Sequence, residues 1–74
     1  MDFGMLWLDD DSKRPFEEKV KRAAEYYRGK YGRKPNFCLV NQKSLKETKS
    51  LGKISIVPDQ SILPNHFLIG LKSI

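Results

Sequence analysis

Apolar residues recur at steps of three and four between Pro15 and Gly32, and this spacing predicts one long amphipathic helix. Pro15 suits the first helical turn, and Asp11 or Ser12 is the expected N-cap. Gly32 is the expected C-cap, and Pro35 prevents the helix from continuing. The residues expected on the buried face of the helix are Phe16, Val20, Ala23, Ala24, Tyr27 and Tyr31.

Short apolar runs before and after this helix predict four strands, at residues 3–9, 37–40, 53–57 and 66–71. The first two runs are apolar at successive positions, which is typical of strands buried on both faces. The third alternates, with Ile54 and Ile56 facing inward, and the fourth places Phe67, Ile69 and Leu71 on one face. The strand residues expected to pack against the helix are Trp7, Phe37, Leu39, Ile54, Ile56, Phe67 and Ile69.

The order of these elements predicts the fold class. A strand, a long helix and a second strand form a βαβ unit with parallel strands and a right-handed crossover. Residues 44–50 predict a short helix capped by Ser44, and the last two strands are expected to be antiparallel. We therefore expect residues 1–74 to form a single α+β (small α/β) domain with the order β-α-β-(short α)-β-β. One long amphipathic helix should lie on one face of a mixed four-stranded sheet.

A single helix covers only one face of such a sheet. Residues 3–8 and 37–40 are nevertheless apolar on both faces, and Leu68 lies opposite the face that carries Phe67. An uncovered apolar face is typical of an interface, and a twofold homodimer is its simplest form. The alternative is that residues 41–52 and 58–65 fold over this face and cover it.

Composition narrows the classes of protein. The 74 residues include one cysteine and one histidine, which excludes a disulfide within the chain and a four-ligand Cys/His zinc site. Packing or association must then stabilise a domain of this size. There is no apolar run near the roughly 20 residues that span a bilayer, and no signal-peptide pattern. We expect a cytoplasmic protein with no membrane partner.

Charge is unevenly distributed along the chain, whose net charge is +5. Residues 1–12 carry −4 and residues 28–53 carry +7, with Glu47 the only acidic residue in the second segment. A basic segment of this kind favours polyanions, although bases near a helix C-terminus also complement the helix dipole. The residues expected to contact nucleic acid, if it binds, are Tyr26, Arg28, Lys30, Arg33, Lys34, Lys43, Lys46 and Lys49.

The residue types that carry catalysis or metal binding do not form a recognisable motif. Asp9 and Asp10 should lie beside Asn41 and Lys43 at one sheet edge, but Mg²⁺ sites usually recruit more carboxylates. His66 has no serine or cysteine nucleophile arranged with it, so a strand-entry histidine with a satisfied hydrogen bond is expected. Cys38 is expected to be a buried hydrophobe, and Trp7 to be a core residue. The sequence therefore predicts no enzyme, catalytic residue, cofactor, metal site or small-molecule substrate.

Two functions follow from these patterns. The first is a non-enzymatic interaction module that forms a homodimer or docks a protein partner through its apolar sheet face. The alternative is a nucleic-acid-binding accessory protein that uses the basic segment 28–53.

Overall fold

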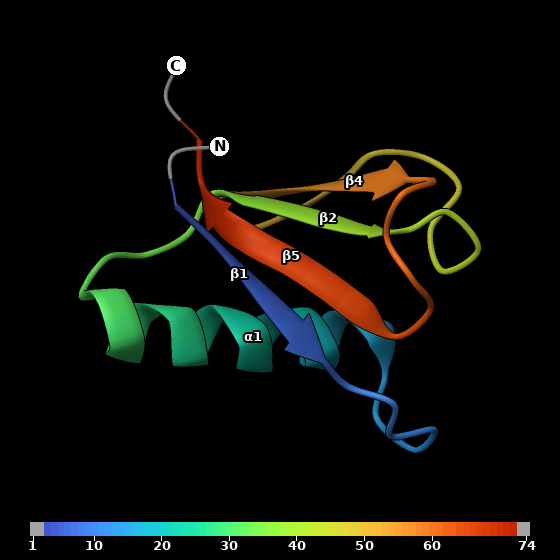
Figure 1. The fold of residues 1–74 in the computed structure, drawn as a ribbon, viewed down its shortest axis with the longest axis horizontal. Coiled ribbons are helices and arrows are strands. Elements are labelled where there is room, and N and C mark those ends of the chain that lie inside the picture. The colour runs from blue at the N-terminus through green and yellow to red at the C-terminus, as the bar shows by residue number, and fades with distance from the viewer. Residues whose placement is uncertain (1–2, 73–74) are drawn as a thin grey trace.

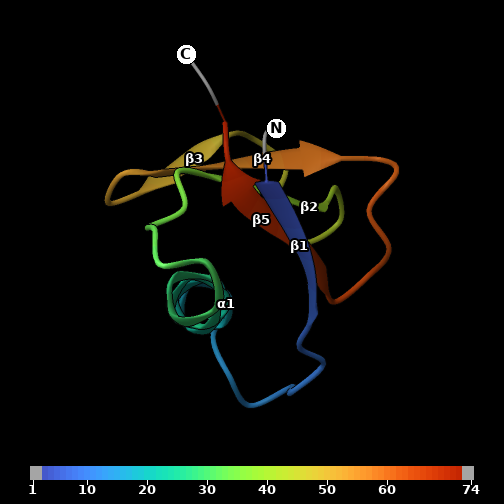
Figure 2. The ribbon, with the colours of Figure 1, turned by 60° about the vertical axis from the view of Figure 1, so that its left-hand side comes forward.

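The computed structural model describes residues 3–72, in which one helix packs against one face of a five-stranded sheet (Figures 1 and 2). A small α+β domain with one helix and a mixed sheet is therefore confirmed, with five strands in place of the four predicted. The elements in chain order are β1 (Phe3–Leu8), α1 (Phe16–Tyr31), β2 (Phe37–Asn41), β3 (Lys49–Leu51), β4 (Ile54–Asp59) and β5 (His66–Leu71).

The strands are arranged in the order β1-β5-β2-β4-β3. β2 pairs with β4 in parallel, and every other neighbouring pair is antiparallel. β1 and β2 run parallel, as predicted for the βαβ unit, but they are not neighbours, because β5 lies between them and pairs antiparallel with both. β4 and β5 run in opposite directions as expected, but β2 separates them. The apolar pattern identifies buried strands without saying which of them are neighbours.

The short helix predicted over residues 44–50 does not form. Residues 42–44 make a turn, and Lys49–Leu51 form β3, which pairs with Ile54–Ile56 of β4. The two strands are joined through Gly52, whose φ of 60° is a conformation that favours glycine. The predicted helix had no apolar face to bury, whereas the hairpin adds strand hydrogen bonds to the sheet. β4 also extends through Pro58, which is tolerated because the pairing with β3 ends at Ile56.

The boundaries of α1 match the predicted helix to within one residue at each end. Gly32 is the C-cap as predicted, with a φ of 72° and an N–H that donates to the Arg28 carbonyl at 2.8 Å. The N-cap is Pro15, so the prediction of Asp11 or Ser12 is wrong. The Asp11 carboxylate instead accepts from the Lys13 N–H at 2.9 Å, in the turn before the helix.

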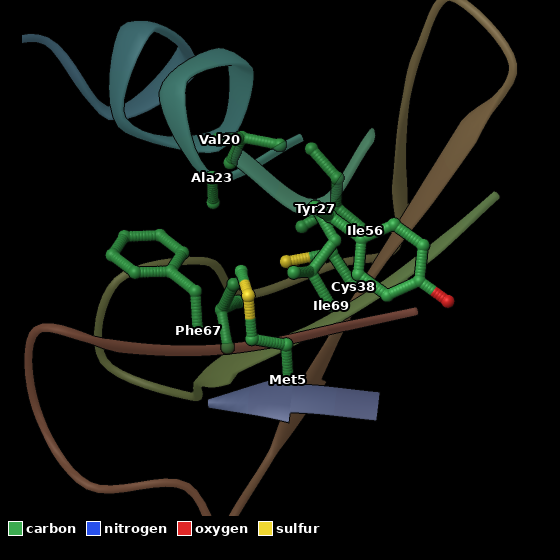
Figure 3. Close-up of a cluster of buried hydrophobic side chains, with 9 residues drawn as sticks. Met5, Val20, Ala23, Tyr27, Cys38, Ile56, Phe67 and Ile69 are labelled. Carbon is green, nitrogen blue, oxygen red and sulfur yellow. The ribbon is translucent and has the colours of Figure 1, made fainter. Parts of the chain in front are cut away.

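The hydrophobic core lies between α1 and the sheet (Figure 3). Val20, Ala23 and Tyr27 are buried as predicted, while Tyr31 is exposed. The prediction that Phe37 and Leu39 face the helix is wrong, because the other two apolar positions of β2 do so. Every residue from 37 to 40 is apolar, so alternation could not choose between the two faces. The strand residues buried against α1 are Met5, Cys38, Val40, Ile56, Phe67 and Ile69.

Two further observations bear on function, one on the buried Cys38 and one on the helix. Burial raises the pKa of the Cys38 thiol to about 12, so this side chain is a small buried hydrophobe, as predicted. Within residues 3–72, no helix combines the length and the apolar character needed to cross a bilayer.

Candidate interaction surfaces

The face of the sheet opposite α1 carries a row of apolar residues that crosses four strands. The strand pairings place Leu6 beside Leu68, Leu68 beside Leu39, and Leu39 beside Val57. Their strand neighbours Met5, Ile69, Val40 and Ile56 point toward the helix, so this row points away from it. We call the surface formed by Leu6, Leu8, Phe37, Leu39, Val57 and Leu68 the helix-free face.

Exposure on the helix-free face is greatest along β1. Leu6 is 62% exposed and Leu8 is 58% exposed, whereas Leu39, Val57 and Leu68 are half-buried. The segment after β2 does not cover β1, because Leu45 packs against the core on the helix side. In the segment before β5, the Ile62 side chain is buried, and the Ile62 carbonyl accepts a hydrogen bond from Asn41 Nδ2 at 2.7 Å. These two segments therefore leave Leu6 and Leu8 in contact with solvent.

The acidic residues after β1 are organised by Arg14. Asp9 is only 6% exposed, and Arg14 Nη1 donates to both of its carboxylate oxygens, at 2.9 and 2.8 Å. Burial alone would raise the pKa of Asp9, but the hydrogen bonds from Arg14 and from the Asp11 N–H outweigh it and lower that pKa below its usual value. β5 separates these carboxylates from Asn41, so the predicted juxtaposition is wrong. Within residues 3–72, no three metal-ligating His, Cys, Asp or Glu side chains gather together.

Asp9→Asn is expected to destabilise the protein at neutral pH, because it removes the charged partner of Arg14. The pKa of Asp9 is lower in the folded state than in the unfolded state, where it is about 3.9. The stability that Asp9 contributes is therefore present above about pH 4 and lost as the pH falls through the folded-state pKa. Urea unfolding of both proteins as a function of pH should show their midpoints converging in acid. A constant difference down to pH 2 would contradict this role.

His66 lies where β5 begins, and its Nδ1 atom lies 2.8 Å from the Pro64 carbonyl. The expected hydrogen bond of a strand-entry histidine is therefore present. Neighbouring Asn65 adopts a φ of 64°, and its carbonyl accepts from the Asp9 N–H at 2.9 Å. This turn thus fixes the end of the β1–β5 pair.

Part of the basic segment gathers around a groove of about 510 Å³ between the C-terminal half of α1 and the β3–β4 hairpin. Arg28, Lys34 and Lys53 line it together with the apolar residues Ala24, Leu51 and Ile54, and with Glu25. A neighbouring groove of about 530 Å³ is lined by Tyr26 and Lys30. The Tyr26 ring is exposed and also packs against Trp7, with ring centroids 4.9 Å apart.

The remaining bases lie elsewhere. Lys43 and Lys46 follow β2, whereas Arg33 and Lys34 precede it, so these two pairs lie at opposite ends of that strand (Figure 1). Lys49 Nζ binds Glu17 Oε2 at 3.1 Å, in the first turn of α1. The +7 segment is thus divided between two ends of the sheet, and Arg28, Lys34 and Lys53 are the bases that share the groove between α1 and the β3–β4 hairpin.

The sequence interpretation missed one feature, which is that β1 lies at the border of the sheet. Its apolar residues on both faces predicted only a strand that is buried on both sides. One related signal was present in the sequence. It contains one long helix, and one helix cannot cover an apolar sheet on both sides. Trp7, on the same strand, packs on the helix side as expected, although its Nε1 atom is buried without a hydrogen-bond partner among the described residues.

Comparison with known proteins adds no family to this description. The chain matches no protein-family model, and neither curated proteins nor solved structures give a significant match. The functional interpretation therefore depends on the chemistry of the surfaces themselves.

Proposed function

We propose that the protein is a non-enzymatic interaction module that self-associates through the helix-free face, with a second copy as the partner. The observation that carries this proposal is the exposure of Leu6 and Leu8 on a face that α1 does not cover. Fully burying a leucine side chain stabilises a complex by roughly 1.5–3 kcal/mol, so two such residues on each copy supply a useful driving force. The same face of a second copy is a matching apolar surface.

The groups that could have carried catalysis have structural roles, which supports the non-enzymatic part of the proposal. Asp9 binds Arg14, His66 lies within hydrogen-bond distance of the Pro64 carbonyl, and Cys38 is buried with a raised pKa. None of these three side chains lines the groove that contains Arg28, Lys34 and Lys53, which we call the basic groove.

Sedimentation analysis of the full chain at micromolar concentrations tests the proposal. We expect a mass twice that of the 8.6 kDa chain. Each copy carries a net charge of +5, so salt should screen the repulsion between copies and strengthen their association. A monomer at every concentration and salt level would contradict self-association.

A second candidate function, nucleic-acid binding, is favoured by the basic groove. Arg28, Lys34 and Lys53 can neutralise phosphates there, while the apolar lining residues Leu51 and Ile54 offer a surface for bases. The exposed Tyr26 ring of the neighbouring groove offers another. No base-reading motif accompanies them, so affinity should depend little on nucleotide sequence.

Titration of fluorescent single- and double-stranded oligonucleotides tests this candidate. Binding should weaken steeply with salt, which is the opposite of the effect on self-association. The double variant Arg33→Glu/Lys34→Glu should weaken binding to every sequence alike. Lys43→Glu/Lys46→Glu, with the same charge change at the other end of β2, serves as the control and should have a smaller effect. Absence of binding at low salt would exclude the candidate.

A further inference from the structure

The two borders of the sheet differ in how they are protected. β3, at one border, has three residues, includes the exposed Lys49, and is short enough to offer little pairing surface. β1, at the other border, has six residues without a charge, a proline or a second neighbouring strand among the described residues (Figure 2). Natural sheets usually protect such a strand, because its free backbone groups pair readily with another strand.

The hydrogen-bond pattern shows which backbone groups of β1 are not used by β5. The Asp9 N–H donates to the Asn65 carbonyl at 2.9 Å, one position beyond the pair of Leu8 with His66. Bonded and non-bonded pairs alternate along an antiparallel ladder, so Met5 and Trp7 share the orientation of Asp9 and bond to β5. Gly4, Leu6 and Leu8 therefore direct their N–H and carbonyl groups away from β5, toward the open side.

We propose that a second copy of the chain pairs with β1 in antiparallel orientation, about a twofold axis at Leu6. This inference rests on the proposed self-association and places the contact at the β1 border of the helix-free face, where Leu6 and Leu8 lie. In this register Leu6 exchanges two hydrogen bonds with Leu6 of the second copy. Gly4 pairs with Leu8 of the second copy, and Leu8 with its Gly4, so all three outward-facing residues are satisfied.

The side chains fit the same register. Residues opposite one another in a ladder share a face, so the two Leu6 side chains become neighbours on the helix-free face. Met5 then lies beside Trp7 of the second copy on the helix side. No charged side chain occurs between Gly4 and Leu8, so the contact line avoids the repulsion expected from the net charge. This uncharged contact line favours a second copy, whose β1 presents the same residues, over a strand that carries charged side chains.

Amide hydrogen exchange measured by NMR distinguishes this geometry from face-to-face packing. At concentrations where sedimentation shows a dimer, the amides of Gly4, Leu6 and Leu8 should be protected, and dilution to monomer should remove that protection. Those of Met5 and Trp7 should be protected in both states. A dimer in which the Leu6 and Leu8 amides exchange freely would overturn the edge pairing and leave the proposed function intact. Absence of any dimer would overturn both.

Two variants at Leu6 distinguish the contribution of its backbone N–H to dimer stability from that of its side chain. Leu6→Pro removes the outward N–H, which β5 does not use, and proline is accepted in edge strands at such positions. Leu6→Ala loses the same apolar side chain but keeps the N–H. We expect the dimer of Leu6→Pro to dissociate at least tenfold more readily than that of Leu6→Ala. Equal dissociation of two folded variants would overturn the inference, and the exchange measurement on the parent decides it if Leu6→Pro does not fold.

Discussion

Replacing Val20 with aspartate is expected to unfold the protein. Val20 has no exposed surface and lies in the core cluster that also contains Phe67 and Ile69 (Figure 3). A carboxylate there would be buried without a partner, at a cost of several kcal/mol. The free energy of unfolding of a whole domain is only about 5–15 kcal/mol, and small domains lie at the low end. Circular dichroism of Val20→Asp should show loss of the helix and of cooperative melting.

Gly29→Asp is the matched control for this substitution. It adds the same charge to the same helix, at an exposed position where an added Cβ meets no atom within 4 Å. This variant should melt cooperatively, close to the temperature of the parent. If Val20→Asp also melted near that temperature, the assignment of the buried face of α1 would be wrong.

Leu6→Lys is expected to give a folded monomer. Leu6 lies on the exposed side of β1, so the fold loses little, whereas a dimer loses an apolar contact from each copy and gains two opposed charges. Losing about 3 kcal/mol raises the dissociation constant by roughly a hundredfold. Sedimentation should therefore detect monomer at concentrations where the parent is a dimer, while circular dichroism remains that of the parent.

Leu63 provides the control for this second substitution. It is 65% exposed, close to the value for Leu6, but it lies in the turn region before β5 and outside the sheet. Leu63→Lys changes the charge and the exposed apolar area in the same way and should leave the dimer intact. Equal loss of association in both variants would show that general charge repulsion, not the helix-free face, controls it.

Local patterns predicted α1 well because everything that defines it lies within the helix itself. The spacing of Val20, Ala23 and Tyr27 identified the buried face, and Gly32 identified the end. Which residues of β2 face the helix could not be predicted, because residues 37–40 are all apolar and either face could be buried. Strand order could not be predicted either, since the insertion of β5 between β1 and β2 depends on contacts between distant segments.

The sequence predicted which residue types form the candidate surfaces, but not which of these residues lie together in the fold. The sequence identified a basic segment, yet only the fold brings Lys53 to the groove of Arg28 and Lys34 and leaves Lys43 outside it. Likewise, the apolar character of Leu6 and Leu8 predicted an uncovered face. That these residues lie at a sheet border depends on the pairing of β1 with β5.

The pairing of β1 with β5 also has a consequence for the time at which the fold can be completed. Trp7 and Phe67 are partners in the ladder although they lie sixty positions apart in the chain. Contacts between such distant segments slow folding, because a long loop must close before they form. On the ribosome, β1 is synthesised long before its partner strand exists. Its apolar residues must therefore wait for β5, and during that interval they are available to chaperones or to other nascent chains.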